Sequence, residues 1–173
     1  GVYDVSMRCC RGILTVHFVR RDNTVYLSDS VYHGPTVAAV GVAAHEAGHA
    51  VQYAENYGPV RLRKAIIPAT QIGSKFSFIL LIIGMALYSQ TLFLTGILLF
   101  SLTTIFQLVT LPVEFNASAR AIETIEGQGL LEGEEIGGVK RVLRAAAMTY
   151  VAALLMSALQ LLRFVLIFLG RSD

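Results

Sequence analysis

The chain has 173 residues, of which 54% are hydrophobic and 15% are charged, and it contains no tryptophan. Water-soluble domains carry about 25% charged residues, so this composition argues against an ordinary globular domain and favours a membrane protein. The formal net charge is only +2, and no basic run is interleaved with aromatic residues, which argues against a nucleic-acid partner.

Residues 1–35 are expected to contain a short β-hairpin. β-branched and aromatic residues fill "ILTVHF" at 13–18 and "TVYL" at 24–27, on either side of the turn-forming "RRDN". The two cysteines, Cys9 and Cys10, are adjacent. This spacing suits neither a zinc ribbon nor a redox motif, so we interpret them as ordinary reduced thiols.

A helix is predicted over residues 36–56, which include the sequence "VAAHEAGHAVQYAEN". Gly34 and Pro35 break the pattern before it, and Gly58 with Pro59 stops it. A helix of this length makes roughly five to six turns.

Residues 72–111 are predicted to form a transmembrane helical hairpin. Residues 92–111 carry no charge, and a run of about 20 apolar residues is long enough to cross the hydrocarbon core of a bilayer. Residues 72–88 are mostly apolar and carry a single charge, Lys75, whose long side chain can reach the interface. A separate helix is expected at 112–126, and a third span over 142–170 after a loop rich in glycine and glutamate.

Positive charges predict the orientation of these spans, because short cytoplasmic segments carry an excess of lysine and arginine. The turn "SQT" between the first two runs carries none, whereas both flanks of the hairpin do: Arg61, Arg63, Lys64 and Lys75 before it, and Arg120, Lys140, Arg141 and Arg144 after it. Both flanks should therefore be cytoplasmic. Two crossings return the chain to one side, so the helix at 112–126 can meet the helix at 36–56.

The predicted helix at 36–56 carries the pattern H-E-x-x-H. His45 and His49 lie about 40° apart around a helix axis, one turn from each other, so both rings can bind one tetrahedral zinc ion. Glu46 lies about 60° from His49, close enough to act as a general base on a water molecule without being a ligand. The same pattern also occurs in unrelated helices, where two histidines simply lie on a polar face.

Glu114 is the candidate third ligand, since catalytic zinc sites keep three protein ligands and two histidines with a glutamate form one known set. It stands in "LPVEFNASARA", directly after an apolar run. A glutamate at the start of a helix is also favoured by the helix dipole alone. The residues by themselves leave both interpretations open.

The two motifs "HEAGHAVQ" and "LPVEFNASARA", separated by a hydrophobic hairpin, resemble the bacterial neutral zinc metallopeptidase family (YugP-like). The segments "NTVYLSDSVYHG" and "RVLRAAAMTYVAA" extend the likeness to nearly the whole chain. More distantly, the arrangement is similar to the HtpX and CAAX prenyl protease group, whose third ligand is a glutamate in an E-F-x-A-D type motif. The resemblance implies zinc on His45, His49 and Glu114, with Glu46 as the catalytic base.

Two departures from these families are visible. Ser118 stands where the wider group has an aspartate that supports the metal ligands, although the closer family also has serine there. The closer family tends to have a membrane segment upstream of the hairpin, and the chain begins at Gly1 without a signal-like apolar run in residues 1–12. We therefore expect the natural protein to start further upstream.

Three further residues are candidates for supporting roles. His17, in the first predicted strand, is a candidate for binding substrate or stabilising the oxyanion, against the simpler interpretation of a surface histidine. Ser118 and Asn116 are candidates for supporting the metal ligands. For Asn116 and the neighbouring Arg120, a surface or packing role is the favoured interpretation.

The sequence thus predicts a single, mainly α-helical integral-membrane domain over residues 1–173, with a zincin-like H-E-x-x-H helix, a β-hairpin and three transmembrane helices. The predicted function is a zinc metalloendopeptidase of the cell membrane, with its site on the cytoplasmic side and membrane-associated protein or peptide substrates. One alternative is a zinc-binding scaffold or regulatory protein. Another is a site-2-type intramembrane protease, which needs an aspartate ligand in a later apolar run. The chain's four aspartates are Asp4, Asp22, Asp29 and Asp173, and none lies in such a run.

Overall fold

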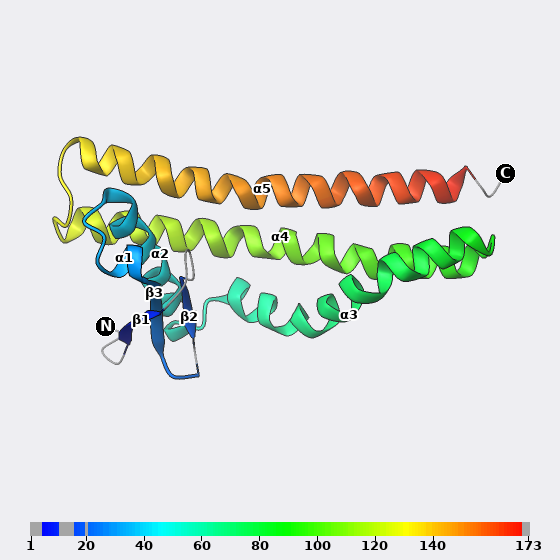
Figure 1. Cartoon of the computed structure of the whole chain (residues 1–173), viewed down its shortest axis with the longest axis horizontal. Coiled ribbons are helices and arrows are strands. Elements are labelled where there is room, and N and C mark those ends of the chain that lie inside the picture. Colours follow the sequence, from blue (N-terminus) through cyan, green and yellow to red (C-terminus); the bar gives the residue numbers. More distant parts are fainter. Residues whose placement is uncertain (1–4, 11–15, 20, 171–173) are drawn as a thin grey trace. The chain divides into compact units, whose positions relative to one another are not determined.

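The computed structural model describes residues 5–10, 16–19 and 21–170 (Figure 1). It is mainly helical with one small sheet. The elements in chain order are β1 (Ser6–Cys10), β2 (His17–Val19), β3 (Thr24–Ser28), α1 (Asp29–Tyr32), α2 (Val37–Ala54), α3 (Gly58–Ala86), α4 (Gln90–Gly127) and α5 (Glu134–Leu169). The chain divides into two compact units, unit 1 (Gly1–Val60 and Pro112–Met148) and unit 2 (Arg61–Leu111 and Thr149–Asp173).

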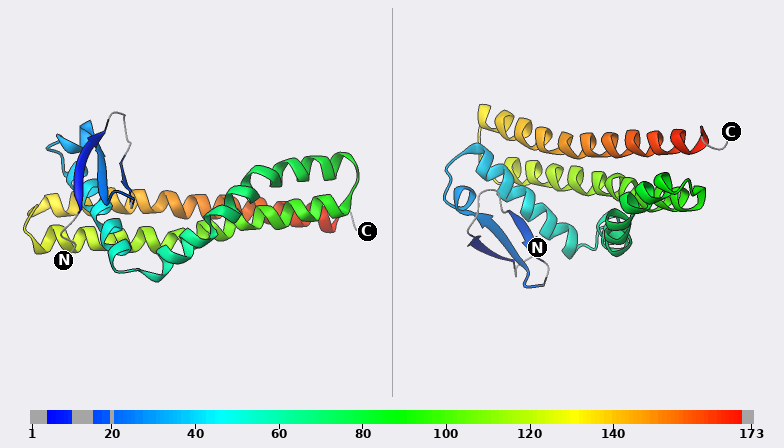
Figure 2. Two further views of the ribbon diagram at one scale, coloured as in Figure 1. Left: turned by 90° about the horizontal axis from the view of Figure 1, so that it is seen from below. Right: turned by 45° about the vertical axis from the view of Figure 1, so that its right-hand side comes forward.

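The sheet in unit 1 has three strands, with β3 in the centre (Figure 2). β2 and β3 are antiparallel, which agrees with the expected hairpin as far as the described residues go. Residues 13–15 of its first predicted strand lie outside them. β1 was not predicted, and it pairs in parallel with β3, placing Cys9 opposite Leu27. Four of the five residues of β3 are buried, so this strand ties the sheet to the rest of unit 1.

Helix α2 agrees closely with the predicted helix at 36–56. The Thr36 side chain caps its start by accepting a hydrogen bond from the Ala39 amide at 3.1 Å, which satisfies one of the donors that a helix leaves free at its first turn. The helix ends at Ala54, and Asn56 has a positive φ of 53°, a conformation that asparagine tolerates well. The Thr36 cap and the positive φ of Asn56 thus mark the two ends of the predicted range, 36–56.

The core of unit 1 forms where α2 meets the parts of α4 and α5 that belong to this unit. Its fully buried members are Ala121, Ile125, Val139 and Leu143. Val37, Val40 and Ala44 of α2 pack against them. These three residues lie at the spacing of one helix face, so α2 is held on its apolar side against α4 and α5.

Gly48 sets how closely α2 approaches α4. A Cβ atom at this position would lie 2.7 Å from the Ala117 carbonyl oxygen and 3.3 Å from the Ala117 Cα. Both are backbone atoms, which cannot turn away as a flexible side chain could. Only glycine therefore allows the two helices to pack at this distance.

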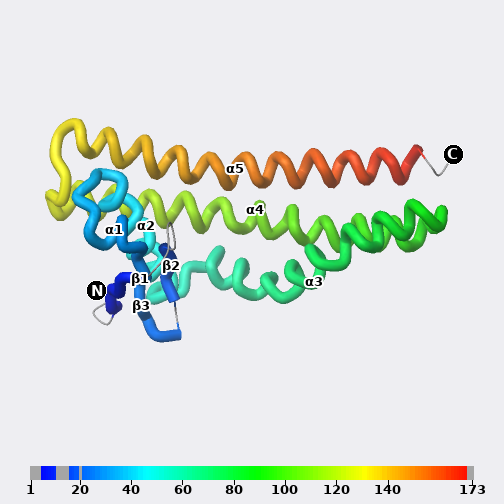
Figure 3. The backbone as a smooth tube through the Cα atoms, viewed as in Figure 1, coloured from blue at the N-terminus to red at the C-terminus, as the bar shows by residue number. Residues whose placement is uncertain are grey.

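The described part of unit 2 contains segments of α3, α4 and α5 and no strand. α3 and α4 are joined by residues 87–89 (Figure 3). Leu81, Phe93 and Ile97 form its buried core, against which Phe164 and neighbouring residues of α5 pack. The rings of Phe78, Phe100 and Phe164 meet edge to face, with centroids 5.3 to 6.1 Å apart.

Among the described residues, three helices are long and apolar enough to cross a membrane, namely α3, α4 and α5. Many large apolar side chains along them are exposed, among them Ile82, Leu98, Leu155, Met156 and Leu159. Exposed apolar surface on this scale is typical of a surface that faces lipid or a partner.

The helix boundaries differ from those expected. α3 begins at Gly58 rather than near residue 72, and α5 begins at Glu134 rather than at 142. α4 continues through Pro112, so residues 112–126 are the end of a long helix and not a separate one. A proline inside a helix removes one backbone hydrogen bond, and here the helix continues past it.

Candidate metal centre

Three side chains from two helices meet in unit 1. His45 and His49 of α2 both direct their Nε2 atoms at Glu114 Oε2 of α4, at distances of 3.3 Å and 3.5 Å. The three ligand atoms lie within 4.8 Å of one another. We call these residues the buried cluster, since the exposed fractions of their side chains are 16%, 13% and 3%.

The geometry of the buried cluster fits a shared zinc ion. Two ligand atoms that each lie about 2.0–2.1 Å from a tetrahedral zinc ion are about 3.3–3.4 Å apart. The two measured distances match this separation, whereas they are long for hydrogen bonds to a carboxylate. Two histidines and one glutamate form a donor set that leaves the fourth zinc position open.

Each imidazole is also held by its other nitrogen. His45 Nδ1 lies 3.1 Å from Ser118 Oγ, and His49 Nδ1 lies 2.9 Å from Gln52 Oε1. Metal-binding histidines commonly have such partners, which fix the ring and leave the second nitrogen for the ion. The rings are therefore already oriented with Nε2 toward Glu114.

The electrostatic surroundings of the cluster favour a positive charge. Burial lowers the pKa of His49, but the hydrogen-bonding and charge of Glu114, assisted by Gln52 and by the charge of Glu46, outweigh burial and raise the pKa above its ordinary value. The same negative surroundings that stabilise a proton on the ring would stabilise a bound cation.

Glu46 lies next to His45 on α2 and is half-buried. Its charge acts on His49, since it contributes to the raised pKa of that ring. Glu46 does not belong to the group of three converging ligand atoms. Its predicted role as a base beside a bound metal ion stays a prediction.

The remaining predicted residues fall into two groups. Ser118 and Asn116 lie near the buried cluster. Ser118 contacts His45 directly, and Asn116 Oδ1 accepts a hydrogen bond from Gln52, which in turn contacts His49. His17, by contrast, is exposed in β2 and stacks on Tyr26 with ring centroids 5.4 Å apart. Its predicted role in substrate binding stays a prediction.

The sequence analysis missed a hydrogen-bonded series around Gln52. This side chain is fully buried and donates from Nε2 to the Val113 carbonyl at 2.8 Å and to Asn116 Oδ1 at 2.9 Å. Arg120 Nε donates to the same Asn116 oxygen at 2.9 Å, and its Nη2 pairs with Glu55 at 2.6 Å. Asn116 and Arg120 therefore take part in this hydrogen-bonded series, and the favoured surface or packing interpretation of both stays a prediction.

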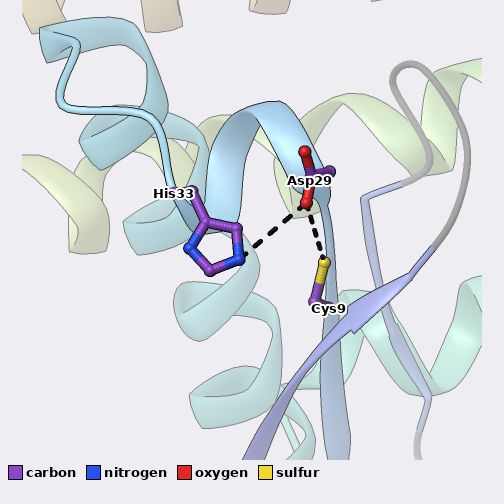
Figure 4. Close-up of side chains that lie close together, drawn as sticks. All are labelled: Cys9, Asp29 and His33. Atoms are coloured by element: carbon purple, nitrogen blue, oxygen red, sulfur yellow. Dashed lines mark hydrogen bonds and ion pairs between the residues drawn. The ribbon is translucent and has the colours of Figure 1, made fainter.

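A second group of ligand-type side chains lies in unit 1, and we call it the exposed cluster (Figure 4). Cys9 Sγ and His33 Nε2 both face Asp29 Oδ1, at 3.7 Å and 3.8 Å. His33 and Asp29 are 67% and 81% exposed. Partial loss of hydration and the Asp29 charge raise the pKa of the Cys9 thiol, which disfavours the thiolate that a metal needs.

Comparison with known proteins places the chain in a family. Residues 1–169 match the family described as "putative neutral zinc metallopeptidase". The chain belongs to this family. It is also 48% identical over 173 residues to the Bacillus subtilis (strain 168) protein named "Putative membrane protease YugP". The aligned region covers 100% of this chain and 77% of that protein. No solved structure matches the chain.

Proposed function

We propose that the chain is a membrane-embedded zinc endopeptidase whose metal is held by the buried cluster of His45, His49 and Glu114. The observation that carries this proposal is the meeting of three zinc-type ligand atoms within 4.8 Å of one another, with both histidine-to-glutamate separations close to those around tetrahedral zinc, on histidines whose other nitrogens contact protein groups. The family and the membrane protease of B. subtilis support the same reaction class.

The reaction is hydrolysis of a peptide bond. A bound zinc ion would supply a Lewis acid that polarises the peptide carbonyl and acidifies a water molecule. Glu46 then accepts a proton from this water as the hydroxyl oxygen attacks the carbonyl carbon, and it delivers the proton to the leaving amine nitrogen. The products are a carboxylic acid and an amine, and Glu46 returns to its starting charge.

We further propose that α3, α4 and α5 span the cell membrane and that the buried cluster lies on the cytoplasmic side. The turn at residues 87–89 has no basic residue, whereas Arg61, Arg63 and Lys64 lie near the start of α3 and Arg120 lies near the end of α4. Substrates would then be protein or peptide segments that are membrane-associated. A site-2-type arrangement is less well supported, because α2 is not among the described helices with the length and apolarity of a span.

The decisive variant for the reaction is Glu46→Gln, assayed in detergent-purified protein for zinc content and for cleavage of an unfolded protein such as casein. We expect the variant to keep one zinc per chain and to lose proteolysis by about 10²- to 10⁴-fold, the contribution of a general base. Full activity in the variant would contradict the mechanism. Stoichiometric zinc in the wild type with no cleavage of any substrate would favour the scaffold alternative.

The orientation has its own test. A single cysteine at Ser89 or at Gln128, in a chain lacking Cys9 and Cys10, is treated with a membrane-impermeant maleimide in intact bacterial cells. We expect labelling at position 89 only. Labelling at position 128 but not at 89 would place the buried cluster on the outer side.

A further inference from the structure

We infer that Gln52 is a positioning residue that fixes which nitrogen of His49 binds the metal, and that Asn116 and Arg120 fix Gln52 in turn. This inference rests on the proposed function, because it assigns a role toward the metal held by the buried cluster. It concerns residues that the family match and the named relative do not assign.

The guanidinium group of Arg120 can only donate hydrogen bonds. It donates from Nε to one side-chain atom of Asn116 at 2.9 Å, so that atom must be the amide oxygen rather than the nitrogen. Arg120 is itself held by Glu55, at 2.6 Å from Nη2. The orientation of the Asn116 amide therefore follows from the fixed charge of Arg120.

The Asn116 oxygen in turn determines the orientation of the Gln52 amide. The Asn116 oxygen lies 2.9 Å from the second amide, and the atom facing it must be a donor, namely Gln52 Nε2. This nitrogen also donates to the Val113 carbonyl at 2.8 Å. Both amide hydrogens are then used, and the remaining atom of the Gln52 amide, turned toward His49, must be the oxygen.

The last step fixes the histidine. Gln52 Oε1 accepts, so His49 Nδ1 must carry the hydrogen in the contact at 2.9 Å. The neutral ring then has its lone pair on Nε2, the atom that faces Glu114 at 3.5 Å. A metal needs this lone pair, so the relay from Arg120 prepares His49 for coordination.

Among the described residues, no such relay reaches the second histidine. His45 Nδ1 contacts the Ser118 hydroxyl at 3.1 Å, and a hydroxyl group can either donate or accept. This contact orients the His45 ring without dictating where its hydrogen lies. The two ligands therefore differ, and the effect of removing the relay should appear on His49.

The test uses full-length chain in detergent and a matched pair of substitutions at Asn116. Asn116→Asp keeps an oxygen that can accept from both Arg120 and Gln52, whereas Asn116→Leu removes it at similar volume. The first readout is nitrogen NMR of the metal-free protein at alkaline pH, which reports the hydrogen-bearing nitrogen of His49. The second is the affinity for Zn²⁺ in competition with a chelator.

We expect wild type and Asn116→Asp to carry the His49 hydrogen on Nδ1 and to bind Zn²⁺ with similar affinity. Asn116→Leu should show a mixture of the two ring forms and bind Zn²⁺ about 10- to 100-fold more weakly, the usual cost of losing an outer partner of a ligand. If circular dichroism shows that Asn116→Leu is unfolded, Arg120→Met is measured instead, with the same expectation.

An unchanged His49 ring form and unchanged Zn²⁺ affinity in the folded Leu or Met variant would overturn the inference. The ring form is read without metal, so the result stands apart from the proposed function. A wild type that carries the hydrogen on Nδ1 and yet binds no Zn²⁺ would sink the proposed metal site and leave the role of Gln52 in fixing the ring intact.

Discussion

The buried and exposed clusters of unit 1 look alike when only the distances between ligand atoms are compared. In each, two ligand atoms face a single carboxylate oxygen, at 3.3 and 3.5 Å on Glu114 and at 3.7 and 3.8 Å on Asp29. Their surroundings differ sharply. Glu114 is 3% exposed and Asp29 is 81% exposed.

This difference in burial matters because close ligand atoms do not by themselves make a metal site. In the buried cluster the outer nitrogens of both histidines contact Ser118 and Gln52, so the side chains need little further ordering when an ion binds. In the exposed cluster an ion must order solvated side chains, and it must displace a proton from a thiol whose pKa is raised. Ordering a side chain on binding costs about 0.5–1.5 kcal/mol.

The largest difference between the two clusters should appear when the central carboxylate of each is removed. Glu114→Gln should abolish stoichiometric Zn²⁺ binding. This loss is larger than the drop in metal affinity of about 10- to 100-fold that follows removal of an outer partner of a ligand. Asp29→Asn should leave Zn²⁺ stoichiometry unchanged. Metal analysis of the purified variants checks both expectations, and they would be contradicted if Asp29→Asn lost the ion while Glu114→Gln retained it.

The next largest effect should come from Gly48→Ala, which alters the packing of α2 on α4 that brings the buried cluster together. The added methyl group would meet the backbone of Ala117, and overpacking of this kind costs about 1–3 kcal/mol. We expect a lower melting temperature and weaker Zn²⁺ binding. Gly127→Ala is the matched control, because nothing lies within 4 Å of its added Cβ, and equal effects of the two substitutions would refute the close-packing argument.

The third prediction compares the two outer partners of the buried cluster, Gln52 and Ser118. Gln52→Met should weaken Zn²⁺ binding more than Ser118→Ala, since only Gln52 belongs to a relay that fixes the histidine. It should also lower stability by about 1–3 kcal/mol, because it leaves buried polar groups without their partner. Chelator competition and thermal unfolding measure the two effects, and a larger loss of affinity in Ser118→Ala would reverse the expected order.

The smallest effect concerns the exposed cluster alone. Asp29→Asn removes the negative charge that helps to raise the pKa of Cys9, so Cys9 should react faster with a maleimide at neutral pH. Cys10 should serve as the internal reference, because its sulfur is hydrogen-bonded to the Leu27 carbonyl instead. Rates are measured in Cys10→Ser and Cys9→Ser backgrounds, and an unchanged rate for Cys9 would show that Asp29 does not act on it.

Local sequence signals predicted much of the fold. The breakers Gly34-Pro35 and Gly58-Pro59 predicted the bounds of α2, and apolar runs predicted the three long helices. β1 was missed because "SMRCC" has no clear strand pattern and is stabilised by parallel pairing with β3, 18 residues further along the chain. The continuation of α4 through Pro112 was missed because a proline in sequence argues for a helix start, while tertiary packing can override it.

The candidate site was predictable in part. His45, Glu46 and His49 follow from helical spacing, and Glu114 needed the resemblance to a family before it outweighed a helix-terminal carboxylate. Gln52 could have been noticed as a polar residue three positions after His49, on the same helix face. Its partners could not, because Val113 and Asn116 lie 61 and 64 residues away, and only the packing of α2 on α4 through Gly48 brings them together.

We propose that the buried cluster holds the catalytic metal. A crystal structure of the zinc-loaded protein, with the ion located by its anomalous scattering, would show where zinc binds. We expect one ion about 2.0–2.2 Å from His45 Nε2, His49 Nε2 and Glu114. An ion at Cys9, Asp29 and His33, with the buried cluster unchanged and metal-free, would refute the proposed metal site.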